Sequence, residues 1–237
     1  MEKGGSRDLH GRALGIFQGL AGSYDKVVDL ATLFQDRYWK SWVVRELGVG
    51  HGSVALDIGC GTLLLEERMG GRGWTFVGLD LTEGMMRLGK AKELSNVDAL
   101  LRGDAEGLPF SDGSFDAVVS CYVPKYVAVR RLAAELGRVC RPGAKAIVYD
   151  FARPKGALAP FLNLYIGGGL RLVGRLLRAG RRVEATTFTD LPGIIGRASW
   201  DEEISGAMES NGFEADEART LTGGVVYCYC GRKRLQA

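Results

Sequence analysis

Short apolar runs alternate with amphipathic stretches through the middle of this 237-residue chain. Runs of four to eight apolar residues bounded by turn residues are typical of buried strands, and an apolar spacing of three and four is typical of helices. The pattern predicts strands at 53–58, 74–80, 97–102, 115–120 and 145–151. It predicts helices between them at about 63–69, 83–93 and 127–140. Strands that alternate with helices form a parallel sheet with right-handed crossovers.

The two ends of the chain have different patterns. Apolar residues at a spacing of three and four predict two or three helices over 13–47. Residues 200–211 form a further expected helix, and two β-rich runs follow at 213–221 and 225–231. The tight glycine link at 222–224 makes those two strands antiparallel neighbours. The expected architecture is therefore an α/β fold, with a mostly parallel sheet, an antiparallel C-terminal hairpin and helices on both faces.

Composition narrows the class of protein only modestly. The chain is 46% hydrophobic and 25% charged, with a net charge of +3, as expected for one globular domain rather than a nucleic-acid-binding protein. No apolar signal segment opens the chain and no uncharged run is long enough to cross a bilayer, so we expect a cytoplasmic protein. The five cysteines and two histidines have no metal-ligand spacing, so no metal site is expected.

The segment Val54-Ala-Leu-Asp-Ile-Gly-Cys-Gly-Thr62 carries the clearest chemical signal. Gly59 and Gly61 follow an expected strand and permit a tight turn and a close approach of a ligand. Asp80 ends the next strand, where a carboxylate accepts hydrogen bonds from both ribose hydroxyls of a nucleotide. Leu64 stands where a dinucleotide fingerprint requires glycine, and Asp57 would repel a diphosphate but suits a cationic ligand.

With Asp57 before the two glycines, this segment resembles motif I of the class I S-adenosylmethionine (SAM) methyltransferases. Over nearly its whole length the chain is similar to the quinone-biosynthesis C-methyltransferases, which methylate demethylmenaquinol and its ubiquinone-pathway counterpart. The other segments that carry the resemblance are Ala21-Gly-Ser-Tyr-Asp25, Gly103-Asp-Ala-Glu-Gly-Leu-Pro-Phe110, Arg141-Pro-Gly143, Asp150-Phe-Ala-Arg-Pro154 and Leu221-Thr-Gly-Gly-Val225. It implies a Rossmann-like class I methyltransferase sheet.

The resemblance also implies the domain organisation and the cofactor. One methyltransferase domain would span 1–237, with a loose tail (1–12), N-terminal helices (13–47), a SAM-binding core (53–151), a substrate lid (152–199) and a C-terminal helix and hairpin (200–237). SAM would bind and leave as S-adenosylhomocysteine (SAH). Asp104 would face the adenine amino group, Ala105 the ring, and Ser120 the rim of the pocket. The complete expected cofactor set is Tyr24, Asp57, Gly59, Gly61, Thr62, Asp80, Leu81, Asp104, Ala105 and Ser120.

Methylation of a quinol carbon requires a base near the phenol, or hydrogen bonds that stabilise the phenolate. Tyr24, Asp25 and Tyr122 are the candidate catalytic residues, and Lys125 is a candidate cation beside the phenolate. The chain departs from the family on the acceptor side, where Pro124-Lys125 replaces an Arg-Asn pair. Ser120-Cys-Tyr-Val123 also lacks the Pro-Pro-aromatic motif of enzymes that methylate amino groups of adenine or glutamine, which argues against a nucleic-acid partner.

Residues 158–182 are expected to determine which methyl acceptor the enzyme binds. Apolar residues dominate this segment, and Arg171, Arg175, Arg178 and Arg182 fall on one helical face. Such a helix either contacts anionic lipid as a peripheral membrane element or packs as a lid with a solvated charged face. The expected partner of the protein is a small-molecule methyl acceptor. A polyprenyl quinol is one such acceptor that is lipophilic. A methyltransferase for a soluble metabolite and a non-catalytic SAM-binding protein remain as alternatives.

Overall fold

The computed structural model describes residues 17, 22, 24–169, 172 and 186–235. Seven strands form one sheet in the order β3-β2-β1-β4-β5-β7-β6. Their bounds are β1 Ser53–Ile58, β2 Trp74–Asp80, β3 Val97–Arg102, β4 Phe115–Cys121, β5 Cys140–Phe151, β6 Phe213–Leu221 and β7 Val226–Lys233. Strands β1 to β5 are parallel, and β7 lies antiparallel between β5 and β6. The predicted mostly parallel sheet with an antiparallel C-terminal hairpin is confirmed.

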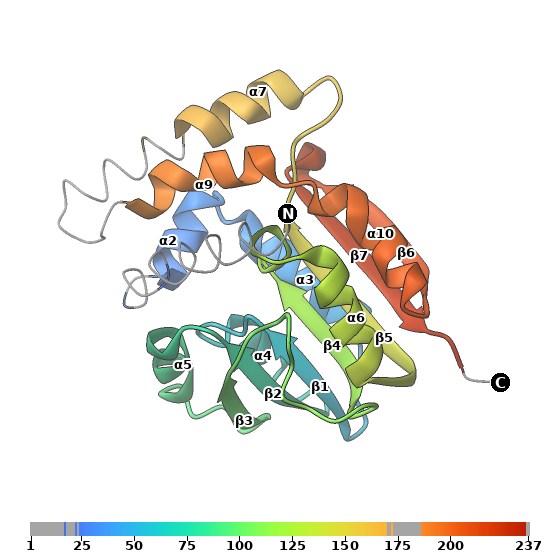
Figure 1. Cartoon of the computed structure of the whole chain (residues 1–237). Coiled ribbons are helices and arrows are strands. Elements are labelled where there is room, and N and C mark those ends of the chain that lie inside the picture. The colour runs from blue at the N-terminus through green and yellow to red at the C-terminus, as the bar shows by residue number, and fades with distance from the viewer. Residues whose placement is uncertain (1–16, 18–21, 23, 170–171, 173–185, 236–237) are drawn as a thin grey trace.

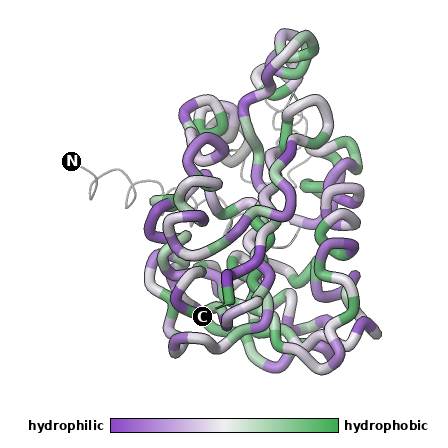
Figure 2. Tube along the Cα trace, turned by 90° about the vertical axis from the view of Figure 1, so that its right-hand side faces the viewer, coloured by the Kyte–Doolittle hydropathy of each residue, from purple (hydrophilic) through white to green (hydrophobic). Residues whose placement is uncertain are grey.

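Helices flank the sheet and gather at one of its ends (Figure 1). Their bounds are α2 Tyr24–Ala31, α3 Gln35–Leu47, α4 Leu64–Met69, α5 Glu83–Lys90, α6 Val129–Val139, α7 Ala159–Leu164, α9 Thr186–Arg197 and α10 Trp200–Ser210. Helices α6 and α10 lie side by side on one face of the sheet, and α2, α7 and α9 lie together at its end (Figure 1). Hydrophobic and hydrophilic stretches alternate along the helices (Figure 2), as amphipathic elements require.

The sheet buries both of its faces. On β4, Ala117 and Val119 belong to a core cluster that includes Trp39 of α3. Val118, between them, points to the opposite face and packs in the cluster of Leu132 on α6. This two-sided burial explains why the strands read as continuous apolar runs rather than as an alternation of apolar and polar residues.

The structure corrects several expected boundaries. Strand β5 begins at Cys140 rather than at 145, because Cys140 already pairs with Phe115 at the irregular start of β4. Gly143, at φ 80°, therefore lies within the strand and does not separate a helix from it. Helices α5 and α6 are shorter than the expected 83–93 and 127–140.

Four elements of the described chain were not expected from the sequence. They are α7, the π-helix Tyr165–Gly169 that follows it, α9 and the short 3₁₀ helix Pro124–Tyr126 after β4. The expected tail at 1–12 and the arginine face at 171–182 lie outside the described residues. Within the part of the chain that the structure describes, no helix is long and apolar enough to cross a membrane.

Candidate active site

The glycine turn after β1 has the tight geometry expected from its sequence. Gly59 and Gly61 have φ values of 78° and 54°, in the left-handed region that favours glycine. The N–H of Gly59 donates to the carbonyl of Leu79 over 2.7 Å, which ties the turn to β2. A Cβ at Gly59 would lie 2.3 Å from the side chain of Val123. The turn therefore brings the end of β1 close to the segment after β4.

Asp80 is held at the end of β2 with both carboxylate oxygens fixed. One oxygen accepts the N–H of Gly61 over 2.9 Å, and the other accepts the N–H of Thr82 over 2.7 Å. Burial raises the pKa of Asp80, and these two N–H groups oppose the shift. A carboxylate has about four acceptor positions, so each oxygen keeps capacity for one hydroxyl of a bound ribose.

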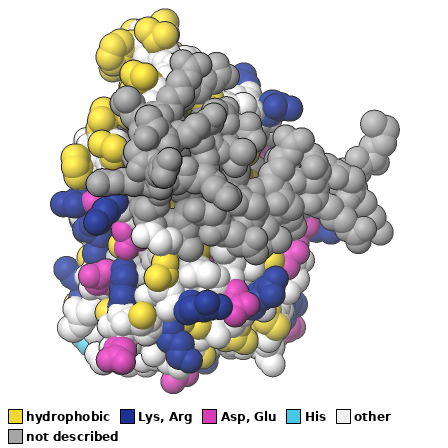
Figure 3. Space-filling view, turned by 90° about the vertical axis from the view of Figure 1, so that its left-hand side faces the viewer, with side chains coloured by type: hydrophobic (Ala, Val, Ile, Leu, Met, Phe, Trp, Pro, Cys, Tyr) yellow, Lys and Arg dark blue, Asp and Glu magenta, His cyan; other side chains and the backbone are white. Residues whose placement is uncertain are grey.

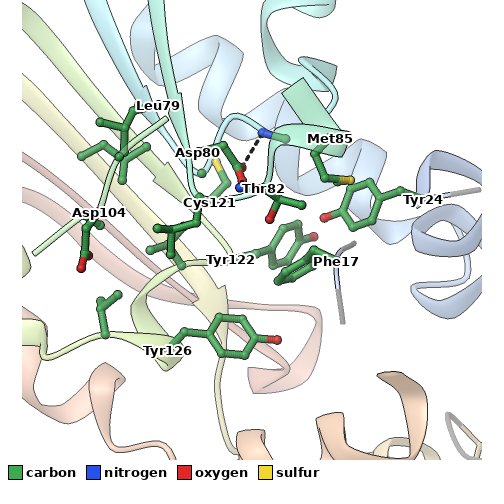
Figure 4. A pocket seen from close by; sticks show the side chains of 18 residues that line it. Phe17, Tyr24, Leu79, Asp80, Thr82, Met85, Asp104, Cys121, Tyr122 and Tyr126 are labelled. Carbon is green, nitrogen blue, oxygen red and sulfur yellow. Dashed lines mark hydrogen bonds between the residues drawn. The ribbon is translucent and has the colours of Figure 1, made fainter. Parts of the chain in front are cut away.

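A cavity opens over this turn. The residues predicted to hold the cofactor or the acceptor that line it are Tyr24, Gly59, Gly61, Asp80, Leu81, Asp104, Ala105 and Tyr122. In Figure 4, Asp80 and Asp104 lie apart along the cavity, and Tyr24 and Phe17 bound its other side. Glycines that admit a close approach, a fixed carboxylate and a second acid beside a small apolar residue fit the ribose and adenine of SAM. We call this space the cofactor cavity.

Four predicted residues do not line that cavity. The Asp25 carboxylate accepts the hydroxyl of Thr62 over 2.5 Å and lies 3.5 Å from the ammonium of Lys92. Ser120 is fully buried within the sheet, where it pairs with Ile58, and its neighbour Cys121 lines the cavity instead.

Asp57 is the fourth, and it lies buried against Glu66 of α4. Burial raises the pKa of Asp57 to about 7 and also raises the pKa of Glu66. Burial disfavours the charged form of both carboxyl groups, and a charge on Asp57 raises the pKa of Glu66 further, so the two groups do not ionise together. The pair therefore retains a proton near neutral pH, beneath the turn rather than inside the cavity.

A second cavity lies beside the first. Apolar side chains from α2, α3, α7, the π-helix Tyr165–Gly169 and the end of β5 form most of its wall, including Val28, Trp39, Phe151, Phe161 and Ile166. No Asp, Glu, Lys, Arg or His is among the described residues that line it. It is a chamber for an apolar molecule, and we call it the apolar chamber.

Four aromatic residues line both spaces and form a partition between them. They are Phe17, Tyr24, Tyr122 and Tyr126. Phe17 packs edge to face with Tyr24 and Tyr126, each at a centroid distance of 5.9 Å. We call these four residues the aromatic partition.

The three partition tyrosines differ in what their hydroxyl groups can do. Tyr122 donates to the buried carboxylate of Asp36 over 2.7 Å, so its hydroxyl is engaged away from both cavities. Within the described chain the hydroxyls of Tyr24 and Tyr126 have no hydrogen-bond partner. Burial raises the pKa of both groups far above neutral pH, so each stays protonated and acts as a donor.

The Lys125 ammonium does not reach either cavity. It is buried and donates to the Asp150 carboxylate and to the Tyr122 carbonyl, each over 2.7 Å. It also lies 4.3 Å from the centroid of the Tyr126 ring. Lys125 therefore contacts the partition residues Tyr122 and Tyr126 on the side away from the cavities and does not contact an acceptor.

Sequence reasoning missed Phe17 and Tyr126 in the partition and Met85 and Val123 in the cofactor cavity. Tyr126 follows Lys125 in the unexpected 3₁₀ helix, so no periodic signal marked it. The close approach of Val123 to Gly59 arises from the fold and has no counterpart in local sequence.

Comparison with known proteins agrees with this geometry. The model of the ubiE/COQ5 methyltransferase family matches residues 7–233. The chain belongs to this family. It is a SAM-dependent methyltransferase with the class I fold, and SAM is its cofactor.

Two curated relatives and one solved structure illustrate the likeness. The demethylmenaquinone methyltransferase of Mycolicibacterium paratuberculosis (strain ATCC BAA-968 / K-10) is 30% identical over 220 residues, covering 92% of both chains. The enzyme of the same name from Staphylococcus carnosus (strain TM300) is 29% identical over 235 residues, covering 92% of this chain and 91% of that one. A methyltransferase crystallised with the Haloferax volcanii Trm112 activator shares the fold, with a TM-score of 0.62 and 16% identity over 92% of this chain and 97% of its own.

Proposed function

We propose that this enzyme transfers a methyl group from SAM to a ring carbon of a lipophilic quinol that occupies the apolar chamber. The observation that carries the proposal is the chamber itself, a space with no charged residue among its described lining residues that shares four lining residues with the cofactor cavity. A soluble polar metabolite would leave its polar groups unsatisfied against such a wall. The names of the two curated relatives support a quinone-type acceptor.

Methyl transfer requires alignment of two molecules and exclusion of water more than it requires covalent chemistry by the protein. When bound, SAM supplies a methyl on a positive sulfur, whose carbon–sulfur bond breaks as a carbon–carbon bond forms, with loss of a ring proton and release of SAH. The residues of the aromatic partition line both cavities, so we place them around the point where the methyl group meets the acceptor carbon, and their rings exclude water there. Their positions determine how closely the acceptor approaches the cofactor.

The protein must also make the ring carbon nucleophilic. Among the predicted catalytic residues we retain Tyr24, whose hydroxyl lacks a partner within the described chain, and we add Tyr126 for the same reason. Both hydroxyls remain protonated, so we assign them to hydrogen bonds that stabilise a phenolate oxygen and not to proton abstraction. Tyr122 and Asp25 are engaged elsewhere, so we propose that they position the partition and the glycine turn.

Exposed apolar side chains surround the opening of the apolar chamber, which we call its rim. They favour entry of the acceptor from a membrane surface. Leu33 and Phe161 line the chamber and are 58% and 71% exposed. Leu158 and Leu164, at the two ends of α7, are also exposed, and hydrophobic side chains gather at the upper edge of the face in Figure 3. An exposed apolar patch at the mouth of a site typically marks an interaction surface. We propose peripheral contact with the cytoplasmic face of the membrane through this rim.

The test is transfer of a labelled methyl group from SAM to reduced demethylmenaquinone in detergent. Wild-type protein should label the quinol. Val28→Trp should fill the chamber and abolish labelling while leaving the Kd for SAM unchanged, because Val28 lines only the apolar chamber. Val28→Ala is the matched control and should retain labelling. Labelling of the quinol by Val28→Trp at the wild-type rate would show that the acceptor binds elsewhere.

A further inference from the structure

The turn between β6 and β7 holds a strained residue that the proposed function does not explain. Thr222 has φ 48°, in the left-handed region that a β-branched residue rarely adopts. Such a conformation is strained and persists where surrounding contacts impose it. The two glycines that follow have φ values of 66° and 93°, and a Cβ on Gly224 would lie 3.2 Å from the backbone nitrogen of Lys155. The turn therefore packs closely against the backbone of the segment that follows β5.

The strain places the Thr222 hydroxyl in a hydrogen-bonded chain. The indole N–H of Trp39 donates to this hydroxyl over 2.8 Å. The hydroxyl in turn donates to the side-chain oxygen of Gln35 over 3.3 Å. All three side chains line the apolar chamber and none lines the cofactor cavity.

Most other polar groups in the chamber wall are already satisfied by the protein. The hydroxyl of Thr32 donates to the carbonyl of Val28, and that of Tyr165 donates to the carbonyl of Ala31, each over 2.8 Å. Among the described residues, the side-chain nitrogen of Gln35 has no hydrogen-bond partner. Gln35 therefore presents unused donors to a space whose wall is otherwise mostly apolar.

Two groups of residues place polar atoms along the chamber. Tyr24 and Tyr126 belong to the partition beside the cofactor cavity. Gln35, Thr222 and Trp39 form the second group, and none of them lines the cofactor cavity. The ring of Phe151 packs against both Trp39 and the partition residue Tyr122, at centroid distances of 5.8 Å and 5.2 Å. Gln35 and Thr222 thus belong to a part of the chamber wall that the cofactor cavity does not share.

We infer that Gln35, held in place by Thr222, donates to a second oxygen of the acceptor, and that it selects an aromatic ring with oxygens on opposite sides over a ring with one oxygen. This inference rests on the proposed function, because it assigns the two ends of the same acceptor. A donor that a bound ligand shields from water and leaves without a partner is costly, so a ligand that lacks the second oxygen should bind more weakly. The expected discrimination is about tenfold, which corresponds to one net hydrogen bond.

The experiment compares 1,4-naphthalenediol with 1-naphthol, which differ by one oxygen. The Kd of each is measured by anaerobic equilibrium dialysis against the full-length protein saturated with SAH. Wild type should bind the diol about tenfold more tightly. Gln35→Leu should reduce that ratio to about one by weakening the diol alone, whereas Val28→Ala should change both Kd values equally and keep the ratio. A Gln35→Leu protein that retains the tenfold ratio, or weakens both ligands equally, would overturn the inference.

Thr222 has its own pair of variants. Thr222→Val keeps the shape of the side chain and removes the hydroxyl, so the ratio should fall, whereas Thr222→Ser should preserve it. An unchanged ratio in Thr222→Val would show that the hydroxyl serves only the Trp39 N–H. Methyl transfer separates this inference from the proposed function. If wild type methylates both compounds and binds them equally, the inference fails alone; if it binds and methylates neither, both fail.

Discussion

The ion pair between Lys125 and Asp150 offers the sharpest test of how the aromatic partition is held. Its two atoms lie 2.7 Å apart, and the side chains are 2% and 0% exposed. Asp150 also accepts the backbone N–H of Lys125 over 3.0 Å, and Lys125 donates to the carbonyl of Tyr122. Lys125→Met retains the length of the side chain and removes its charge, so it leaves the Asp150 carboxylate buried and unpaired.

Removing one partner of a buried pair costs about 3–5 kcal/mol, because the remaining charge has lost its compensation. For a chain of this size, each kcal/mol lowers the Tm by about 2–4 °C, so the expected fall is about 6–20 °C. The free energy of unfolding would be measured by urea titration of wild type, Lys125→Met, Asp150→Asn and the double variant. The double variant should be more stable than the sum of the single losses implies, because it leaves no buried charge.

A loss below about 1 kcal/mol in Lys125→Met would refute the reasoning, since surface pairs contribute that little. Strict additivity of the two substitutions would also contradict it, because additivity means that the two side chains do not interact.

Three further predictions address the cofactor, the buried acids and the membrane. Asp80→Ala should weaken SAM binding on the order of 100-fold in calorimetry, because two hydrogen bonds to a charged acceptor are lost; an unchanged Kd would refute the ribose assignment. The pKa of Asp57 is raised from 3.8 to about 7, so protonated Asp57 contributes to the free energy of unfolding, at most on the order of 4 kcal/mol. This contribution is complete below pH 4 and is lost as pH rises through 7. Glu66→Gln removes the second buried carboxyl group and should flatten the fall of the Tm between pH 4 and pH 7; equal slopes would contradict this. Phe161→Glu should reduce sedimentation with anionic vesicles, whereas Leu235→Glu, at an equally exposed site near the C-terminal end, should not.

Local sequence patterns predicted the parts of the fold that local physics determines. Strands β1 and β2 match their expected bounds because buried parallel strands are mostly apolar runs between turn residues. The predicted start of β5 was wrong. Pro142 and Gly143 locally indicate a break, but pairing of Cys140 with Phe115 extends the strand through them. Tertiary pairing outweighed the turn signal there.

The same division holds for the candidate site. Gly59, Gly61 and Asp80 were predicted because their roles depend on a strand, a turn and the next strand, which are close in sequence. Whether Asp57 lines the cavity depends instead on Glu66, which approaches it from α4. The partition brings together segments more than 100 residues apart, so no spacing rule could indicate it.

The measurement that tests the account most directly is the position of the transferred methyl group. SAM carrying a deuterated methyl would be incubated with the enzyme and reduced demethylmenaquinone in detergent, and the product fragmented by mass spectrometry. The account predicts one deuterated methyl on a ring carbon next to a hydroxyl-bearing carbon. A methyl ether, or an unlabelled quinol recovered from a protein that binds SAM, would contradict it.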